Sequence, residues 1–188
     1  MSHICCFTGY RPHRFAFSAD GLCPEQVAAA LGKQIAALYD EGCRVFISGM
    51  CVGVDLWAAD AVLRFRQTHP DVELWAAVPF RGQEGRWPLP VQTEYRRVLA
   101  ACQRVEVLFD EDAARADAAA CYRGRNRWMV DRADTVVAVY ALEDTDRRSG
   151  TAATVRYARK QQRRILYIHP QTLAVTEETV QQIQFFMD

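Results

Sequence analysis

The chain has 188 residues, 50% of them hydrophobic, and its 23 lysines and arginines balance its 23 aspartates and glutamates. This length favours a single domain over residues 1–188. The balanced charge disfavours a nucleic-acid partner. The lack of an apolar run of about 20 residues disfavours a membrane partner. Seven cysteines without Cys-x-x-Cys spacing and four scattered histidines indicate a reduced, cytoplasmic protein without a metal site.

The first half of the chain alternates short apolar runs with segments of helical periodicity. In the first such segment, Val27, Leu31 and Ile35 recur at helical spacing. Pro24 fits the first turn of that helix and Gly42 its end. The predicted strands of this half are 3–8, 45–47 and 72–78, and the predicted helices are 24–41, 56–69 and 91–102.

The same alternation continues through the second half. The predicted strands are 105–109, 135–140 and 164–168, and the predicted helices are 110–120, 122–134, 151–161 and an amphipathic 176–187. Alternating strands and helices favour right-handed crossovers and parallel strands. The fold class is therefore α/β, a three-layer doubly wound and mostly parallel sheet of about six strands, whose ligands bind beyond the carboxyl ends of the strands.

The turn after the second strand joins an apolar strand to a helix through glycines. It reads Ser48-Gly49-Met50-Cys51-Val52-Gly53-Val54-Asp55, with Asp55 at the N-cap position. Exposed N–H groups and the positive end of a helix dipole suit a phosphate, although glycines also occur simply where a chain reverses tightly. The turn is neither a dinucleotide fingerprint nor a Walker loop. Cys51 is interpreted as structural, since no histidine is placed by sequence to act as its base.

Four loops start where a strand ends, and we expect them to meet at one edge of the sheet. Arg11 suits bidentate contact with a phosphate or a surface ion pair, and Thr8 suits a ligand contact or a cap of the strand end. The long loop at 80–90, which carries Arg81 and Trp87, has the length of a lid, or packs on its own proline and tryptophan. The four loops are Thr8–Arg11, Ser48–Asp55, Pro79–Arg86 and Tyr140–Thr151.

Four motifs in this order resemble the YpsA-like family of the SLOG superfamily of Rossmann-like proteins, which also holds the DprA/Smf and LOG families. They are Thr8-Gly9-Tyr10-Arg11-Pro12, Ser48-Gly49-Met50-x-x-Gly53-Val54-Asp55, Tyr122-x-x-Arg125-Asn126-x-x-Met129 and Ser149-Gly150-Thr151-x-x-Thr154. The resemblance implies that the glycine turn and the Gly-Thr turn hold the phosphate of a nucleotide-like ligand. The expected ligand residues are Thr8, Gly9, Arg11, Ser48, Gly49, Met50, Gly53, Asp55, Arg125, Asn126, Ser149, Gly150 and Thr151.

LOG enzymes hydrolyse the base–ribose bond of nucleoside monophosphates, with a glutamate shortly after the Gly-Thr pair. This chain has Ala152-Ala153-Thr154 there and Asn126 in place of a lysine, so the matching carboxylate is absent. Arg125, Asp55 and Glu94 are weak catalytic candidates, and Glu84 is a further carboxylate on another loop. For Arg125 and Asn126 the alternative is a solvated helix face. Tyr122 could stack on a base or pack in a core, and for Trp128 we favour the core.

Three functions follow from these patterns. The first is a protein that binds or senses a nucleotide or ADP-ribose-type ligand, with no cofactor certain. The second is a nucleoside-monophosphate hydrolase of the LOG type. The third, a DprA-like binder of single-stranded DNA, depends on arginine pairs such as 147–148 and 163–164 and is disfavoured by the balanced charge. Phe185 and Phe186 suit either packing on the sheet or a contact in a homo-oligomer.

Overall fold

A seven-stranded sheet forms the middle layer of the protein, in the order β4-β3-β2-β1-β5-β6-β7. The structure is a computed structural model that describes residues 3–18, 21–146 and 149–179. All neighbouring strands are parallel except β7, which runs antiparallel to β6. The strands are β1 (His3–Gly9), β2 (Cys43–Ser48), β3 (Glu73–Val78), β4 (Arg104–Val107), β5 (Thr135–Val139), β6 (Arg164–Ile168) and β7 (Val175–Glu178).

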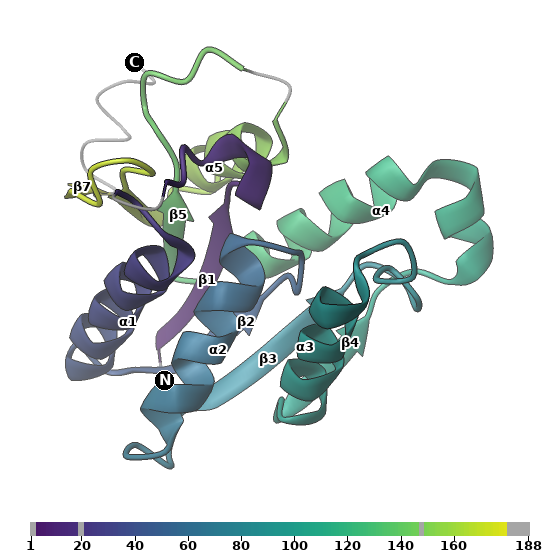
Figure 1. The fold of residues 1–188 in the computed structure, drawn as a ribbon, viewed down its shortest axis with the longest axis horizontal. Helices are drawn as coiled ribbons and strands as arrows, with labels where there is room; N and C mark the ends of the chain where they lie inside the picture. The colour runs from purple at the N-terminus through teal and green to yellow at the C-terminus, as the bar shows by residue number, and fades with distance from the viewer. Residues whose placement is uncertain (1–2, 19–20, 147–148, 180–188) are drawn as a thin grey trace.

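Helices cover both faces of this sheet and complete the three predicted layers. The first three α-helices lie on one face, and the last two lie on the other (Figure 1). A short 3-10 turn, η1 (Pro12–Arg14), follows β1. The helices are α1 (Pro24–Asp40), α2 (Val54–Arg66), α3 (Leu89–Ala100), α4 (Glu111–Arg132) and α5 (Gly150–Lys160).

The central strands are buried on both faces, which explains their continuous apolar sequences. Cys5, Cys6 and Phe7 of β1 are fully buried, as are Val136 and Val137 of β5. Burial raises the pKa of the Cys5 and Cys6 thiols, so these side chains stay protonated and pack as small hydrophobes.

The order of the strands reverses beside β1. From β1 the chain adds β2, β3 and β4 outward on one side, and α4 then carries it back to β5 on the other side of β1. Loops that leave β1 and β5 therefore diverge to opposite faces, and this opens a crevice at the carboxyl ends of the two strands. The fold thus places any ligand site at this edge.

The two helices predicted at 110–120 and 122–134 form one helix, α4, with a kink at Asp117. Asp110 caps its start by accepting the Ala113 N–H at 2.8 Å. Asp117 has non-helical φ/ψ of −155° and 86° and accepts the Ala120 N–H at 2.8 Å, so it restarts the helix as a second N-cap. The break predicted near Cys121 therefore lies four residues earlier.

The predicted final helix at 176–187 is wrong at its start, because Val175–Glu178 is β7. This short strand pairs with the edge of β6, and Glu178 accepts hydrogen bonds from Arg159 and Tyr167. Pairing with the sheet edge thus decides the conformation over local helical periodicity. It also makes the sheet seven-stranded instead of six-stranded. The remainder of the predicted helix, with Phe185 and Phe186, lies outside the described residues.

Candidate functional site

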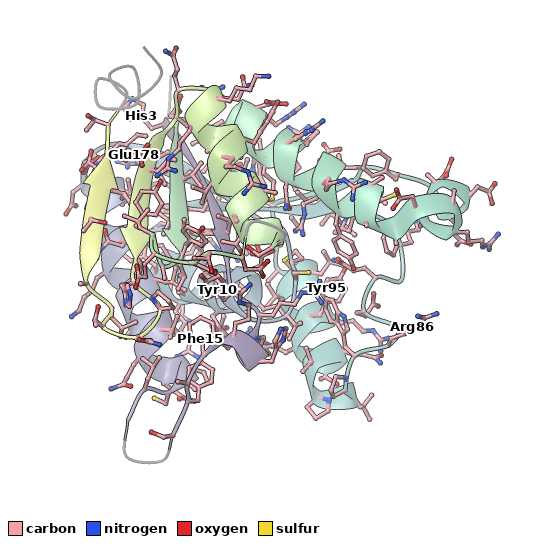
Figure 2. The ribbon with its side chains drawn as sticks, turned by 90° about the horizontal axis from the view of Figure 1, so that it is seen from above. His3, Tyr10, Phe15, Arg86, Tyr95 and Glu178 are labelled. Carbon is pink, nitrogen blue, oxygen red and sulfur yellow. The ribbon has the colours of Figure 1, made fainter. Side chains whose placement is uncertain are left out.

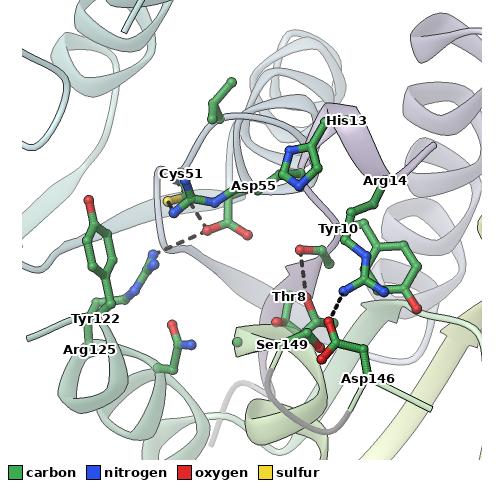
Figure 3. A pocket seen from close by; sticks show the side chains of 16 residues that line it. Thr8, Tyr10, His13, Arg14, Cys51, Asp55, Tyr122, Arg125, Asp146 and Ser149 are labelled. Atoms are coloured by element: carbon green, nitrogen blue, oxygen red, sulfur yellow. Dashed lines mark hydrogen bonds and ion pairs between the residues drawn. The ribbon is translucent and has the colours of Figure 1, made fainter. Parts of the chain in front are cut away.

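A polar cleft of about 270 Å³ lies at the carboxyl ends of β1, β2 and β5, where the strand order reverses (Figure 3). It collects side chains from the β1 loop, the β2–α2 turn, the middle of α4 and the start of α5. The lining residues are Thr8, Gly9, Tyr10, Arg11, His13, Arg14, Cys51, Val52, Asp55, Tyr122, Arg125, Asn126, Asp146, Ser149, Gly150 and Thr151.

Many of the predicted ligand residues lie together in this cleft. Their contacts with a ligand remain predictions. Of the four loops expected to converge, the one at 79–86 contributes no residue to the cleft and lines a neighbouring pocket instead. The predicted residues that line the cleft are Thr8, Gly9, Arg11, Asp55, Arg125, Asn126, Ser149, Gly150 and Thr151.

The other predicted residues of the β2–α2 turn support the cleft from behind. The Ser48 hydroxyl accepts the Met50 N–H at 3.0 Å and donates to the Asp55 carbonyl at 2.8 Å, and Met50 is fully buried. Gly53 is the N-cap of α2 with φ of 100°, and a Cβ there would lie 2.8 Å from the Tyr10 carbonyl oxygen. Ser48, Met50 and Gly53 therefore fix the turn, and glycine is required where the turn meets the β1 loop.

Asp55 is not the N-cap that its sequence position predicted. It lies in the first turn of α2, where its carboxylate accepts the Cys51 N–H at 3.3 Å and pairs with Nη1 of Arg125 at 3.2 Å (Figure 3). The side chains of Asp55 and Arg125 are only 11% and 4% exposed. The solvated helix face considered for Arg125 is thus wrong. Burial raises the pKa of the Asp55 carboxyl, and the Arg125 guanidinium opposes this rise.

Hydrogen bonds fasten the start of α5 to β1 and α4. The Thr151 hydroxyl donates to the Gly9 carbonyl at 2.9 Å, and Nδ2 of Asn126 donates to the Thr154 hydroxyl at 2.9 Å. Ser149 caps the helix by accepting the Ala152 N–H at 3.0 Å. The first turn of α5, with its N–H groups and positive dipole end, is therefore held at the cleft wall.

The sequence patterns missed several residues of the cleft. Cys51, interpreted as structural, lines the wall, and its sulfur lies 3.7 Å from Nη2 of Arg11. Tyr122, for which stacking on a base and packing in a core were the two alternatives, was not missed: it lines the cleft, with the Arg125 guanidinium 5.8 Å from the centre of its ring. His13 follows Pro12 in η1, so its place in the sequence next to the β1 loop was a signal that could have found it. Trp128 packs against the hydrophobic core, as predicted.

A charged cluster ties the β1 loop to the loop after β5. Arg14 pairs with Asp144 and with Asp146, each at 2.7 Å, and the Tyr10 hydroxyl donates to Asp144. Figure 3 shows Arg14 reaching Asp146 across the cleft rim. The pKa of Asp144 lies below its ordinary value of 3.8, chiefly because its carboxylate accepts the Tyr10 hydrogen bond. The hydrogen bond from the Asp146 N–H and the charge of Arg14 lower the pKa further.

We expect Asp144→Asn to lower the free energy of unfolding by about 1–2 kcal/mol at neutral pH, because the charged hydrogen bonds lose their carboxylate. The pKa of the Asp144 carboxyl is lower in the folded chain than in the unfolded chain. The stabilisation is therefore complete at pH values above the pKa of the unfolded chain, and it is lost as the pH falls through the pKa of the folded chain. Denaturant unfolding between pH 7 and pH 2 measures the difference. Asp112→Asn, with a side chain that is 91% exposed, is the control. If the difference in unfolding free energy between Asp144→Asn and the wild type stays constant from pH 7 to pH 2, the charged Asp144 carboxylate is not the source of the stabilisation.

Glu94 lies outside the cleft. It is on α3 and pairs with Arg97 at 2.6 Å, while Glu84 lies 3.6 Å from Arg96. The carboxylates on the cleft wall are instead Asp55 and Asp146. Among the described residues no group of three histidine, cysteine, aspartate or glutamate side chains could hold a metal ion. No helix in the described part of the chain is long and apolar enough to cross a membrane.

Comparison with protein families and curated relatives extends these observations. The sequence profile described as the YspA SLOG family (YpsA) matches residues 5–173. A UPF0398 protein of Halalkalibacterium halodurans is 28% identical over 165 residues, which cover 87% of this chain and 84% of that relative. The UPF0398 protein YpsA of Bacillus subtilis is 28% identical over 142 residues, which cover 74% of this chain and 77% of the relative.

Solved structures share the fold. DNA processing protein A of Streptococcus pneumoniae has a TM-score of 0.59 at 18% identity, and the match covers 92% of this chain. It covers 52% of that protein, so this chain spans about half its length. DNA processing protein A of Helicobacter pylori has a TM-score of 0.58 at 17% identity, covering 98% of this chain and 72% of the other. At these identities the comparison shows the Rossmann-like SLOG fold alone.

Proposed function

This chain belongs to the YspA SLOG family, and from that premise we propose that its cleft binds the phosphate of a nucleotide-type ligand. The ligand is a nucleoside monophosphate or an ADP-ribose derivative, and the protein acts as its binding or sensing protein. The observation that carries this proposal is the meeting of Arg11, Arg125 and the first turn of α5 on the walls of one polar cleft.

The charges on the cleft wall favour an anion. Three arginines line it against two aspartates, and two of these arginines are paired, Arg125 with Asp55 and Arg14 with Asp146. Arg11 makes no ion pair with a carboxylate among the described residues, and Nη2 of its guanidinium donates to the Cys51 sulfur at 3.7 Å. One exposed guanidinium is therefore left to bind a phosphate bidentately.

Backbone groups supply the second half of the proposed phosphate site. The four N–H groups at the start of an α-helix lack partners within the helix, and the helix dipole adds a partial positive charge. The Ser149 hydroxyl accepts a hydrogen bond from the Ala152 N–H. Gly150 and Thr151, in the same turn, line the cleft. Gly150 has open space where a Cβ would stand, so a ligand can approach its backbone closely.

We expect isothermal titration calorimetry to detect binding of a member of a panel of nucleoside monophosphates, ADP-ribose and ribose 5-phosphate. Arg11→Gln should weaken that binding by roughly ten- to a hundredfold, since a charge-assisted hydrogen bond contributes about 1.5–3 kcal/mol. Arg64→Gln is the matched control, because it removes the same charge from a side chain that is 79% exposed on α2. Absence of binding across the panel, or equal losses in both variants, would refute the proposal.

Hydrolysis of a nucleoside monophosphate is a second candidate, and the position of Asp55 favours it. A carboxyl in the cleft with a raised pKa is suited to proton transfer. Its contacts with Arg125 and with the Cys51 N–H, however, both hold the carboxylate in place. The same titration mixtures, analysed for released ribose 5-phosphate, separate the two candidates, since Asp55→Asn should abolish any release.

Binding of single-stranded DNA, the property of the Helicobacter pylori protein, receives less support. Arg164 pairs with Glu41 and Glu177, and Arg163 donates to the Asp131 carbonyl at 3.0 Å. These guanidinium groups are engaged within the chain, and phosphate-backbone affinity needs free ones. The other arginine pair, 147–148, lies outside the described residues.

A further inference from the structure

A second pocket of about 800 Å³ adjoins the cleft, between the β3–α3 loop and the first half of α4. Tyr122 lines both cavities, so they meet at its side chain. In Figures 1 and 2 the first half of α4 extends beyond the sheet, and the loop with Arg86 lies on the α3 side of it. The phosphate site and this pocket are thus neighbours along α4.

Aromatic side chains form much of the pocket wall. Phe80 and Tyr122 meet edge to face, with ring centres 5.5 Å apart and planes at 71°. Trp87 packs in the same manner on Tyr95, at 5.5 Å and 88°. Phe80, Trp87 and Tyr122 all line the pocket, two from the loop and one from α4. Rings held in this way offer stacking surfaces for a flat heteroaromatic group.

Gln83, which lines this pocket, has a hydrogen-bonding atom without a partner. Its side chain is buried, with a relative exposure of 6%, and its Nε2 donates to the Tyr95 hydroxyl at 3.5 Å. Its Oε1 is buried and has no hydrogen-bond partner among the described residues. A buried polar atom without a partner is unfavourable, so a ligand atom that completes the pair is stabilised there.

We propose that this pocket binds the base of a nucleotide whose phosphate lies in the cleft. The inference rests on the proposed function and adds the part of the ligand that gives selectivity. The primary amide of Gln83 both donates and accepts, as the hydrogen-bonding edge of a nucleobase does, while Phe80, Trp87 and Tyr122 contact its faces. Arg81 and Arg86 line the pocket and are exposed, while the carboxylate of the lining, Glu111, is paired with Arg115, so the pocket carries a positive excess that attracts anionic ligands.

The test compares a nucleoside monophosphate with ribose 5-phosphate, which carries the phosphate and sugar without the base. The wild type should bind the better nucleotide at least about fivefold more tightly, because stacking and one hydrogen bond are added. Gln83→Leu should remove the part of this advantage that comes from the hydrogen bond and leave the affinity for ribose 5-phosphate unchanged. Gln67→Leu, at the exposed end of α2, is the control.

Fluorescence gives a second readout that does not depend on Gln83. Nucleotide should quench tryptophan emission and ribose 5-phosphate should not, and Trp87→Phe should abolish the quenching. Equal affinity for the two ligands in the wild type, with no effect of Gln83→Leu, would overturn the base pocket and leave the phosphate site standing. Binding of neither ligand would overturn both. A quenching signal that survives Trp87→Phe would place the base elsewhere and refute the assignment.

Discussion

Gly49→Ala should abolish ligand binding and destabilise the fold by about 2–4 kcal/mol. A Cβ at position 49 would fall directly on Nη1 of Arg125 and 2.6 Å from Oδ2 of Asp55. The Arg125 side chain is only 4% exposed, so it cannot move aside without breaking its ion pair. Titration calorimetry and denaturant unfolding measure the two losses.

Gly32→Ala is the matched control for this substitution. Gly32 lies within α1, and a Cβ there meets no atom within 4 Å. Because alanine is the better helix former, this variant should gain about 0.5–1 kcal/mol and bind normally. If Gly49→Ala behaves like Gly32→Ala, the close approach of Arg125 to the glycine turn is not needed for the site.

Asp55→Ala should cost about 3–5 kcal/mol of stability, because it leaves the Arg125 guanidinium buried without its carboxylate. The ion pair joins α2 to α4 across 70 residues of sequence. Denaturant unfolding of the purified variant measures this loss.

The double variant Asp55→Ala/Arg125→Met separates charge from packing. Removing both charges should restore much of the stability, while the phosphate affinity stays lost because the arginine is gone. A single variant that unfolds within about 0.5 kcal/mol of the wild type would show that the pair does not hold the site together.

The local sequence is enough to predict where the strands that carry the cleft end. Runs such as 45–47 and 135–139 are apolar and β-branched, and a glycine, proline or polar turn ends each of them. Because parallel strands end at one edge, the amino-acid sequence alone is enough to expect Thr8, Arg11 and Thr151 there. The alternation of elements likewise predicts the doubly wound sheet.

The remaining features depend on contacts between distant residues. The hydrogen bond from Tyr10 to Asp144 spans 134 residues, and no local pattern signals it. Strand β7 forms because the β6 edge is free to pair, although residues 176–179 also fit a helical periodicity. The kink at Asp117 differs, because it depends on a local contact, the hydrogen bond from the Ala120 N–H to the Asp117 carboxylate. Aspartate is a poor helix former and a good N-cap, so this residue was a local signal for the break within the alanine-rich stretch.

The position of a bound phosphate is the decisive observation for the proposed site, and a crystal structure of the protein soaked with the nucleoside monophosphate that titrates best would show it. We predict that the phosphate oxygens lie within hydrogen-bond distance of the Arg11 guanidinium and of the backbone N–H groups of Gly150 and Thr151. We also predict that the base lies beside Tyr122 and Gln83. A phosphate bound away from the carboxyl ends of β1 and β5 would contradict the proposal that this cleft is the phosphate site.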